Sequence, residues 1–306
     1  MSIILTNVPY TSNLLQMNLT ALMQKYPFLN VQTVGLSVLG KPIYAIRLGR
    51  GNKKVFYSAS FHANEWITSV VLMKFIEDYS DSYLNNKKLS GYSIRNLFQD
   101  TSIYLIPMVN PDGVDLVTGA ILESDLSYAS AKKIADMYPS IPFPNGWKAN
   151  IDGVDLNLQF PAGWENARNI KYAQGFTSPA PRDFVGYAPL STPEALAVYH
   201  FTLLHSFSLV IAYHTQGQEI YWNFQNINPP RGYEIGSQFA SVSGYSLVDV
   251  PYNSSFAGFK DWFIQDYKKP GYTVEAGLGK NPLPISQFDE IYRDNLGILV
   301  LGAVLA

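Results

Sequence analysis

The stretch KKVFYSASFHANEW, residues 53–66, decides the fold and begins the site. Its first half is a run of β-branched and aromatic residues, which predicts a buried strand that ends at Ser60 and Phe61. His62 and Glu65 follow directly, three positions apart. Two side chains of these types, placed just beyond a strand, can converge on one metal ion. The stretch therefore predicts a buried strand that leads into a metal-binding turn.

Strands and helices alternate along the rest of the chain. Apolar residues at helical spacing predict four helices, at residues 12–26, 66–84, 191–204 and 284–306. β-branched and aromatic runs predict a hairpin and three further strands, at residues 31–51, 101–110, 207–214 and 272–275. Residues 139–188 are rich in Pro, Gly, Asn and Trp, so we expect an extended loop region there, beside the site.

This alternation predicts an α/β fold, built as a single domain with a mixed, mostly parallel twisted sheet and helices on both faces. In such sheets, ligands bind beyond the carboxyl ends of the strands. His62, Asn110, His214 and Glu275 all fall at predicted strand ends. We therefore expect these four side chains to meet at one edge of the sheet.

The composition limits the partners and the chemistry that this chain can have. The 306 residues are 47% hydrophobic and 15% charged, which is enough apolar material for a large core. A net charge of −2 and the lack of a basic run argue against a nucleic-acid partner. The chain has no cysteine, so disulfides, thiolate ligands and cysteine nucleophiles are excluded. Any metal ion must be held by imidazole and carboxylate groups.

The chain offers no sign of export or membrane insertion. Its first residues, MSIILTNVPYTSNLL, lack the positive start and sustained apolar run of a signal peptide. No apolar run approaches the roughly 20 residues that a membrane helix needs. We therefore expect a cytoplasmic protein with no membrane span.

A catalytic zinc site needs three protein ligands, so the pair at His62 and Glu65 requires a third from elsewhere. Of the four histidines, His214 alone stands at a predicted strand end. His200 and His205 lie on or just after a predicted helix, without an acidic partner at ligand spacing. We expect those two to be structural.

Five motifs, FHANEW, VNPDGV, DGVDLN, AYHTQG and YTVEAG, follow one another along the chain. Their order and approximate spacing resemble the zinc carboxypeptidase family from about residue 35 to the C-terminus. The resemblance implies a zinc peptidase catalytic domain over residues 1–306. It implies one zinc ion held by His62, Glu65 and His214, and Glu275 as the general base that activates the attacking water.

The chain departs from the family pattern at two positions. The family binds a substrate's C-terminal carboxylate with an Asn-Arg pair in G-V-D-L-N-R-N-F, whereas residues 153–160 read GVDLNLQF. Asn157 is retained as a substrate-binding residue, but Leu158 cannot pair with a carboxylate. Lys148 replaces the arginine that stabilises the oxyanion, and as a catalytic residue it would still supply positive charge there.

One subgroup of the family resembles this chain most, the γ-D-glutamyl-L-diamino acid peptidases of spore-forming bacteria. The segments WKANIDGVDLNLQFPAGWE and VEAGLGKNPLP carry that resemblance. It implies cleavage of the bond between γ-D-glutamate and meso-diaminopimelate or L-lysine in cell-wall stem peptides. The expected partner is a stem peptide or muropeptide, met in the cytoplasm or in a sporulating compartment.

Such a substrate carries a free α-carboxylate on D-glutamate, so we expect a cationic pocket. The candidates are Lys260, Arg168, Arg182 and Lys280. Lys260 is favoured for substrate binding because it aligns with the family's specificity pocket. Tyr252 aligns with the family's mobile tyrosine, or Asn253 does if the register differs by one residue.

Other functions stay open at this point. An ordinary zinc carboxypeptidase that releases C-terminal amino acids would keep the same metal site, but Leu158 argues against it. A deacylase of small N-acyl amino acids would keep the site as well. A binding protein that has lost the reaction is disfavoured because His62, Glu65, His214 and Glu275 are all present.

Overall fold

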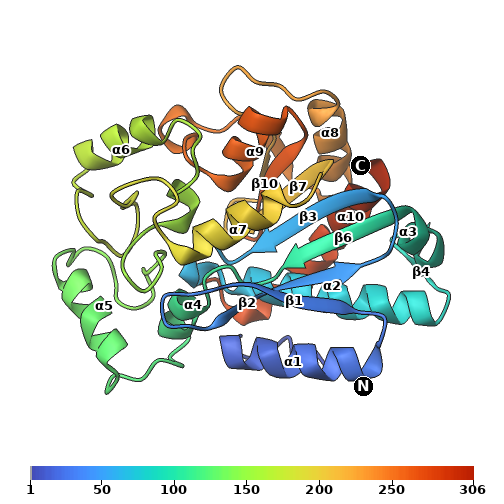
Figure 1. The fold of residues 1–306 in the computed structure, drawn as a ribbon, viewed down its shortest axis with the longest axis horizontal. Coiled ribbons are helices and arrows are strands. Elements are labelled where there is room, and N and C mark those ends of the chain that lie inside the picture. Colours follow the sequence, from blue (N-terminus) through green and yellow to red (C-terminus); the bar gives the residue numbers. More distant parts are fainter. Residues whose placement is uncertain (1) are drawn as a thin grey trace.

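One mixed sheet of eight strands runs through the middle of the molecule (Figure 1). The computed structural model describes residues 2–306. The strands of the sheet are β1 (Asn30–Leu36), β2 (Pro42–Leu48), β3 (Lys53–Ala59), β6 (Thr101–Ile106), β7 (Leu209–His214), β8 (Glu219–Tyr221), β9 (Ser246–Val248) and β10 (Gly271–Glu275). Two short strands, β4 (Lys88–Leu89) and β5 (Tyr92–Ser93), pair separately.

The centre of the sheet is parallel. The strand order is β1-β2-β6-β3-β7-β10-β8-β9, and the four neighbours β6, β3, β7 and β10 run in the same direction. The predicted hairpin is confirmed, because β1 and β2 pair antiparallel. The carboxyl ends of the four parallel strands therefore lie side by side at one edge, where the sequence placed the polar motifs.

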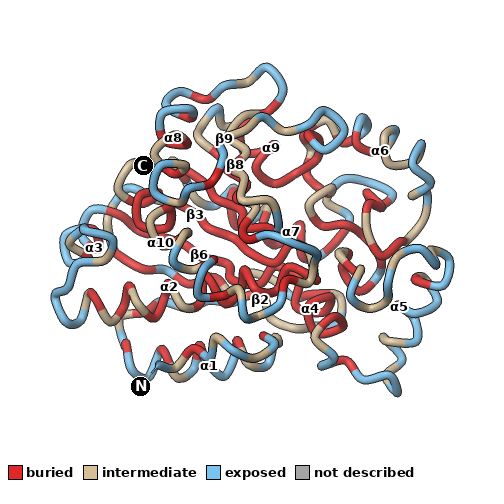
Figure 2. The backbone as a smooth tube through the Cα atoms, turned by 180° about the vertical axis from the view of Figure 1, so that it is seen from behind, coloured by how far each residue is buried: buried red, intermediate tan, exposed pale blue. Residues whose placement is uncertain are grey.

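Alternate residues of the central strands pack into two separate cores. In β3, Val55 and Tyr57 join one apolar cluster, whereas Phe56 joins the other. In β7, Tyr213 and Val210 divide in the same way. Because strand side chains alternate between faces, these two clusters cover the two faces of the sheet. Buried chain accordingly runs through the centre of the molecule in Figure 2.

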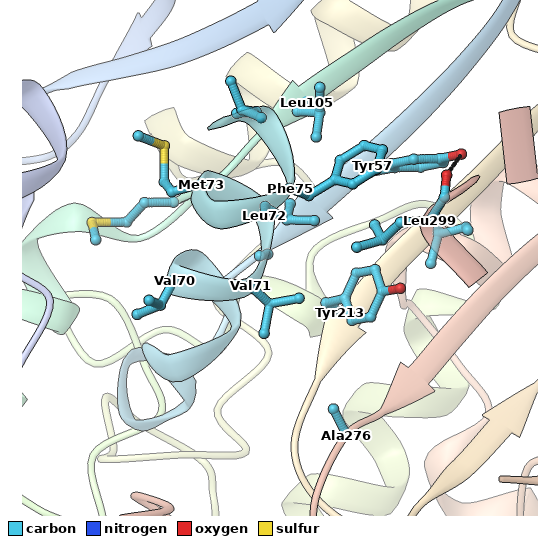
Figure 3. Packing of buried hydrophobic residues seen from close by; sticks show 14 of the residues in the cluster. Tyr57, Val70, Val71, Leu72, Met73, Phe75, Leu105, Tyr213, Ala276 and Leu299 are labelled. Atoms are coloured by element: carbon cyan, nitrogen blue, oxygen red, sulfur yellow. Dashed lines mark hydrogen bonds between the residues drawn. The ribbon is translucent and has the colours of Figure 1, made fainter. Parts of the chain in front are cut away.

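Helices cover both faces, as the sequence predicted. On one face, α2 (Ile67–Leu84) and α10 (Phe288–Leu305) pack against the strands and against each other, with Tyr57, Tyr213 and Leu299 among the residues in contact (Figure 3). On the other face lie α7 (Pro193–Leu203) and α9 (Phe259–Tyr267). The remaining helices are α1 (Ser12–Lys25), α3 (Ile94–Asp100), α4 (Pro111–Val117), α5 (Leu126–Asp136), α6 (Trp164–Ala173) and α8 (Gly232–Ser243).

Several expected boundaries differ from the structure. β3 ends at Ala59, because Ser60 takes a left-handed backbone conformation with φ of 51°. β6 ends at Ile106 rather than at residue 110, since the chain turns there and Pro111 begins α4. The C-terminal helix begins at Phe288, after a single turn that follows Pro284. The expected loop region 139–188 is interrupted by the short helix α6. No helix among residues 2–306 is both long and apolar enough to cross a membrane.

Candidate active site

The turn after β3 carries two of the expected metal ligands to the edge of the sheet. The Ser60 amide donates to the Thr68 hydroxyl at 3.1 Å, and the Ser60 and Ser69 hydroxyls are bonded at 2.7 Å. These bonds hold the end of β3 against the first turn of α2. His62 then leads into a single 3-10 turn, Ala63–Glu65, which brings Glu65 back beside it.

His62, Glu65 and His214 converge on one point. Glu65 Oε1 lies 2.9 Å from His62 Nδ1, and Glu65 Oε2 lies 2.9 Å from His214 Nδ1. The two Nδ1 atoms are 3.2 Å apart. Zinc held at about 2.0–2.1 Å by tetrahedral ligands would separate the ligand atoms by about 3.4 Å. The donor set of two imidazoles and one carboxylate therefore fits a zinc ion in both chemistry and spacing.

Asp155 orients the His62 ring. His62 Nε2 lies 3.1 Å from Asp155 Oδ1, and the same carboxylate accepts the backbone amides of Asn157 at 3.2 Å and Asp183 at 3.2 Å. Because the carboxylate can only accept, Nε2 carries the proton and Nδ1 is left to face the metal position. Asp155 stands inside the motif DGVDLN, but the motif alone does not indicate this role.

The charges of these side chains shift one another's pKa values. Burial alone would lower the pKa of His62, but the Glu65 and Asp155 carboxylates outweigh it and raise that pKa to about 9, so a metal ion would bind Nδ1 by displacing its proton. Burial lowers the pKa of His214, and Glu65 offsets this only in part. Burial opposes ionisation of Glu65, yet His62, Lys148 and His214 hold its pKa well below the ordinary value. Glu65 is therefore an ionised ligand at neutral pH.

Lys148 and Glu275 flank this group. The Lys148 ammonium donates to Glu65 Oε1 at 3.0 Å, and its side chain is 18% exposed. Glu275 ends β10, where its backbone is in register with His214 on the neighbouring strand. Burial, and next the charge of Glu65, raise the pKa of Glu275 to about 8. A carboxyl group with this pKa can hold and release a proton near neutral pH.

Loops that are distant in sequence are tied together behind the site by Asn110. Its side-chain amide donates to the carbonyls of Phe61 at 3.2 Å and Ala149 at 2.9 Å, while its Oδ1 accepts the Gly113 amide at 3.0 Å. The Ala63 amide also donates to the Lys148 carbonyl at 3.0 Å. The loop that carries His62 and the loop that carries Lys148 are thus held in one arrangement.

A cavity of about 250 Å³ opens beside the group and is lined by His62, Lys148 and Glu275. Asn157, Leu158 and Lys260 form part of its wall, as do Arg182 and Asp183. The Lys260 ammonium is buried, donates to the Asn223 carbonyl at 2.6 Å and pairs with Asp261 at 2.6 Å. Asn157 Oδ1 accepts the Phe259 amide at 3.1 Å, which joins Asn157 to the start of α9.

Three aromatic or imidazole side chains lie outside this arrangement. Tyr252 is 64% exposed and does not line the cavity, although its ring packs edge-on against Phe256, which does. His205 stacks on Phe207, and its Nδ1 bonds to a backbone carbonyl. His200 is exposed on α7. Neither of these two histidines approaches the metal position.

Tyr221 and Asn281 also lie at the site, and neither is among the residues predicted from the sequence. Tyr221 ends β8, lines the cavity next to Glu275, and donates its hydroxyl proton to Glu219 at 2.7 Å. Asn281 donates to the Thr215 carbonyl at 2.9 Å and approaches Glu65 Oε1 at 3.5 Å. Asn281 stands inside the quoted segment VEAGLGKNPLP, so a signal for it was present, whereas Tyr221 belongs to none of the motifs.

A buried His-Glu-His group with a second, proton-holding carboxylate at the edge of a parallel sheet defines a metal-dependent hydrolase site. Residues 15–297 match the zinc carboxypeptidase family. The chain belongs to the zinc carboxypeptidase family, and its His-Glu-His group points to a zinc-binding site. It is therefore a zinc metallopeptidase by membership of that family.

Two relatives and one solved structure are similar to this chain over most of its length. The chain is 46% identical to gamma-D-glutamyl-L-diamino acid endopeptidase 1 of Lysinibacillus sphaericus, over 97% of this chain and 72% of that protein. It is 41% identical to the uncharacterized protein YqgT of Bacillus subtilis (strain 168), over 95% of this chain and 76% of that protein. Among solved structures, carboxypeptidase A of Helicoverpa armigera aligns with a TM-score of 0.72 at 19% identity, over 100% of this chain and 76% of that one. That structural likeness confirms the α/β carboxypeptidase fold.

Proposed function

We propose that this protein hydrolyses the bond between γ-D-glutamate and meso-diaminopimelate or L-lysine in cell-wall stem peptides or muropeptides. The convergence of His62, Glu65 and His214 beside Glu275 carries the hydrolytic part of the proposal. One zinc ion would be held by His62 Nδ1, Glu65 and His214 Nδ1. The substrate part is supported by the similarity to the Lysinibacillus endopeptidase.

We assign the roles of the side chains from their positions. Zinc would polarise the scissile carbonyl and acidify the attacking water. In its ionised form, Glu275 takes the proton from that water at its carboxylate and returns it to the amine that leaves. Lys148 places a cation beside the metal ligands, where it stabilises negative charge that develops on the carbonyl oxygen.

The cavity beside the metal ligands can take a diamino acid, and at position 158 it lacks the arginine with which the family binds a peptide's C-terminal carboxylate. Leu158 lines the wall there and cannot bind a terminal carboxylate. The buried pair of Lys260 and Asp261 offers one cation and one anion to the polar end of a diamino acid side chain. Asn157 lines the same cavity, and we assign it to substrate binding. Tyr252 would need to swing inward from the rim to contact the substrate.

The test is hydrolysis of L-Ala-γ-D-Glu-meso-diaminopimelate by the zinc-loaded protein. We expect cleavage at the γ-glutamyl bond, and we expect both a chelator and the Glu275→Ala substitution to abolish it. The L-lysine peptide, run in parallel, distinguishes the two diamino acids. If an ordinary peptide is shortened from its C-terminus while the γ-glutamyl bond stays intact, the protein is an ordinary carboxypeptidase and the proposal is wrong.

Three finer expectations accompany this proposal. We assign residues 1–306 to one catalytic domain. A location in the cytoplasm or in a sporulating compartment, and a role in sporulation, stay predictions from the sequence. Immunodetection of the protein in fractionated vegetative and sporulating cells would test both.

A further inference from the structure

A second cavity, of about 610 Å³, opens on the other side of the proposed catalytic residues. Lys148, Arg182, Tyr221 and Glu275 line both cavities, so these residues form the boundary between them. Of the two cavities, Lys280 lines only the second. Three cations and a single carboxylate, Glu275, therefore face the second cavity, so the charge of its lining favours an anion.

The backbone on either side of Arg182 is anchored to the site. The Pro181 carbonyl accepts the amides of Lys148 at 2.7 Å and Ala149 at 3.0 Å. The Asp183 amide donates to Asp155, the carboxylate that orients His62, at 3.2 Å. Arg182 is thus held at a defined distance from the metal ligands, although it lies in an irregular segment.

The Arg182 side chain keeps donors for a ligand. Its Nε bonds to Asp183, and that single carboxylate also binds the Lys171 ammonium. Two cations therefore share one anion, which leaves a net positive charge. The Arg182 side chain is 43% exposed, so its guanidinium is reachable from solvent. A guanidinium can bind a carboxylate through two parallel hydrogen bonds.

Two of the other cations that the sequence offered, Lys260 and Arg168, are engaged elsewhere, and so is Lys148. Lys260 lies in the first cavity and is paired with Asp261. Arg168, on α6, lies over the Trp164 ring at 5.2 Å and lines neither of the two cavities. Lys148 is paired with the proposed metal ligand Glu65. Arg182, with Lys280 at the exposed rim, is therefore the best-placed cation for a new anionic group.

A γ-linked D-glutamyl residue presents such a group. Its α-carboxylate stays free and is separated from the scissile carbonyl by only a short chain of carbons, whereas an α-linked peptide without an acidic side chain at this residue has no charge there. We propose that Arg182, assisted by Lys280, binds this α-carboxylate and thereby selects γ-linked acidic substrates. This inference rests on the proposed function, and it assigns the second cavity to the glutamyl side of the bond and the first to the diamino acid side.

The experiment compares two peptides that differ at one group. The first is L-Ala-γ-D-Glu-meso-diaminopimelate, and the second is its isoglutaminyl analogue, in which the α-carboxylate is a carboxamide. We expect the unchanged protein to lose about 10- to 100-fold in kcat/KM on the amide, since a charged hydrogen-bonded contact is lost. In Arg182→Gln, the acid peptide should fall by a similar factor, while the amide peptide changes less than about threefold.

Three further variants sharpen the result. Arg182→Lys should recover part of the preference, because it keeps the charge without the fork. Lys280→Gln should have a smaller effect in the same direction. Arg293→Gln, which removes a 72% exposed arginine on α10, should leave both peptides unchanged. Zinc content and the thermal midpoint are measured for every variant.

The possible outcomes distinguish a failure of this inference from a failure of the proposed function. If the unchanged protein cleaves both peptides at equal rates, Arg182 does not read the carboxylate and only this inference is overturned. The same holds if Arg182→Gln slows both peptides equally. If the unchanged protein cleaves neither, the proposed function fails and this inference fails with it. Should Arg182→Gln not fold, the comparison of peptides on the unchanged protein still decides.

Discussion

At the scale of single residues, Asp155 determines which nitrogen of His62 faces the metal position. It accepts from the ring and from two backbone amides at once, so its charge and its geometry both matter. We expect Asp155→Asn to weaken zinc binding by about 10- to 100-fold, because an amide cannot replace all three acceptor contacts or the charge. Competition with a chelating dye measures this affinity. Asp152→Asn, on the exposed side of the same loop, is the control; equal affinities in both variants would contradict the assignment.

Glu194 provides a pH-dependent prediction that is independent of the metal site. It is fully buried, and its carboxyl accepts the Val38 amide at 3.2 Å and the Asn150 side chain at 3.3 Å. Burial is the main reason that its pKa rises from 4.5 to about 7. The unfolded chain therefore loses this proton at lower pH than the folded protein does.

Stability should consequently fall as the pH rises from 4.5 to 7, and stay reduced above 7. One pKa unit corresponds to about 1.4 kcal/mol, so the loss is ~3 kcal/mol. Glu194→Gln cannot titrate and should remove this part of the pH dependence, leaving a constant offset. Urea unfolding of both proteins at several pH values measures the difference between them. Parallel profiles for the two proteins would show that Glu194 titrates normally.

At the scale of elements, α10 packs closely against β3 at a glycine. A Cβ atom at Gly302 would lie 2.5 Å from the Tyr57 hydroxyl, which donates to the Leu299 carbonyl at 3.0 Å (Figure 3). Gly302→Ala should therefore destabilise the protein by about 1–3 kcal/mol through overpacking, despite alanine's better helix propensity. In the Tyr57→Phe background the hydroxyl is absent, so the same change should cost less. A double-mutant cycle of unfolding free energies measures the coupling, and additive effects would contradict this packing.

The elements that sequence could predict are those whose local pattern matches their environment. The central strands are buried on both faces, so most of β6 and β7 is an apolar run that is easily recognised. In contrast, α9 is nine residues long and dense in aromatic residues, which favour strands. It is helical because Phe259, Trp262 and Phe263, at the helical spacing i, i+3 and i+4, are buried against the sheet, and so short a pattern is hard to distinguish from a strand in the sequence.

At the scale of the whole molecule, the site is assembled from segments that are far apart in sequence. The family motifs identified His62, Glu65, His214 and Glu275, and the parallel sheet explains why they meet. From the sequence, Arg182 could be named only as one of four candidate cations for the substrate carboxylate. Its position depends on hydrogen bonds between irregular segments, which leave no periodicity in the sequence.

The same assembly makes the metal ion a structural link as well as a reagent. His62 and Glu65 follow β3, whereas His214 ends β7, so a bound ion joins two central strands at their carboxyl ends. A ligand present at about 1,000 times its Kd stabilises the folded state by about 4 kcal/mol. Removing zinc should therefore lower the thermal midpoint by roughly 5–10 °C, and adding zinc back should restore it. Calorimetry with and without a chelator measures the shift. In His214→Ala, which lacks a ligand, the chelator should have much less effect; an equal shift in both proteins would mean that the chelator acts elsewhere.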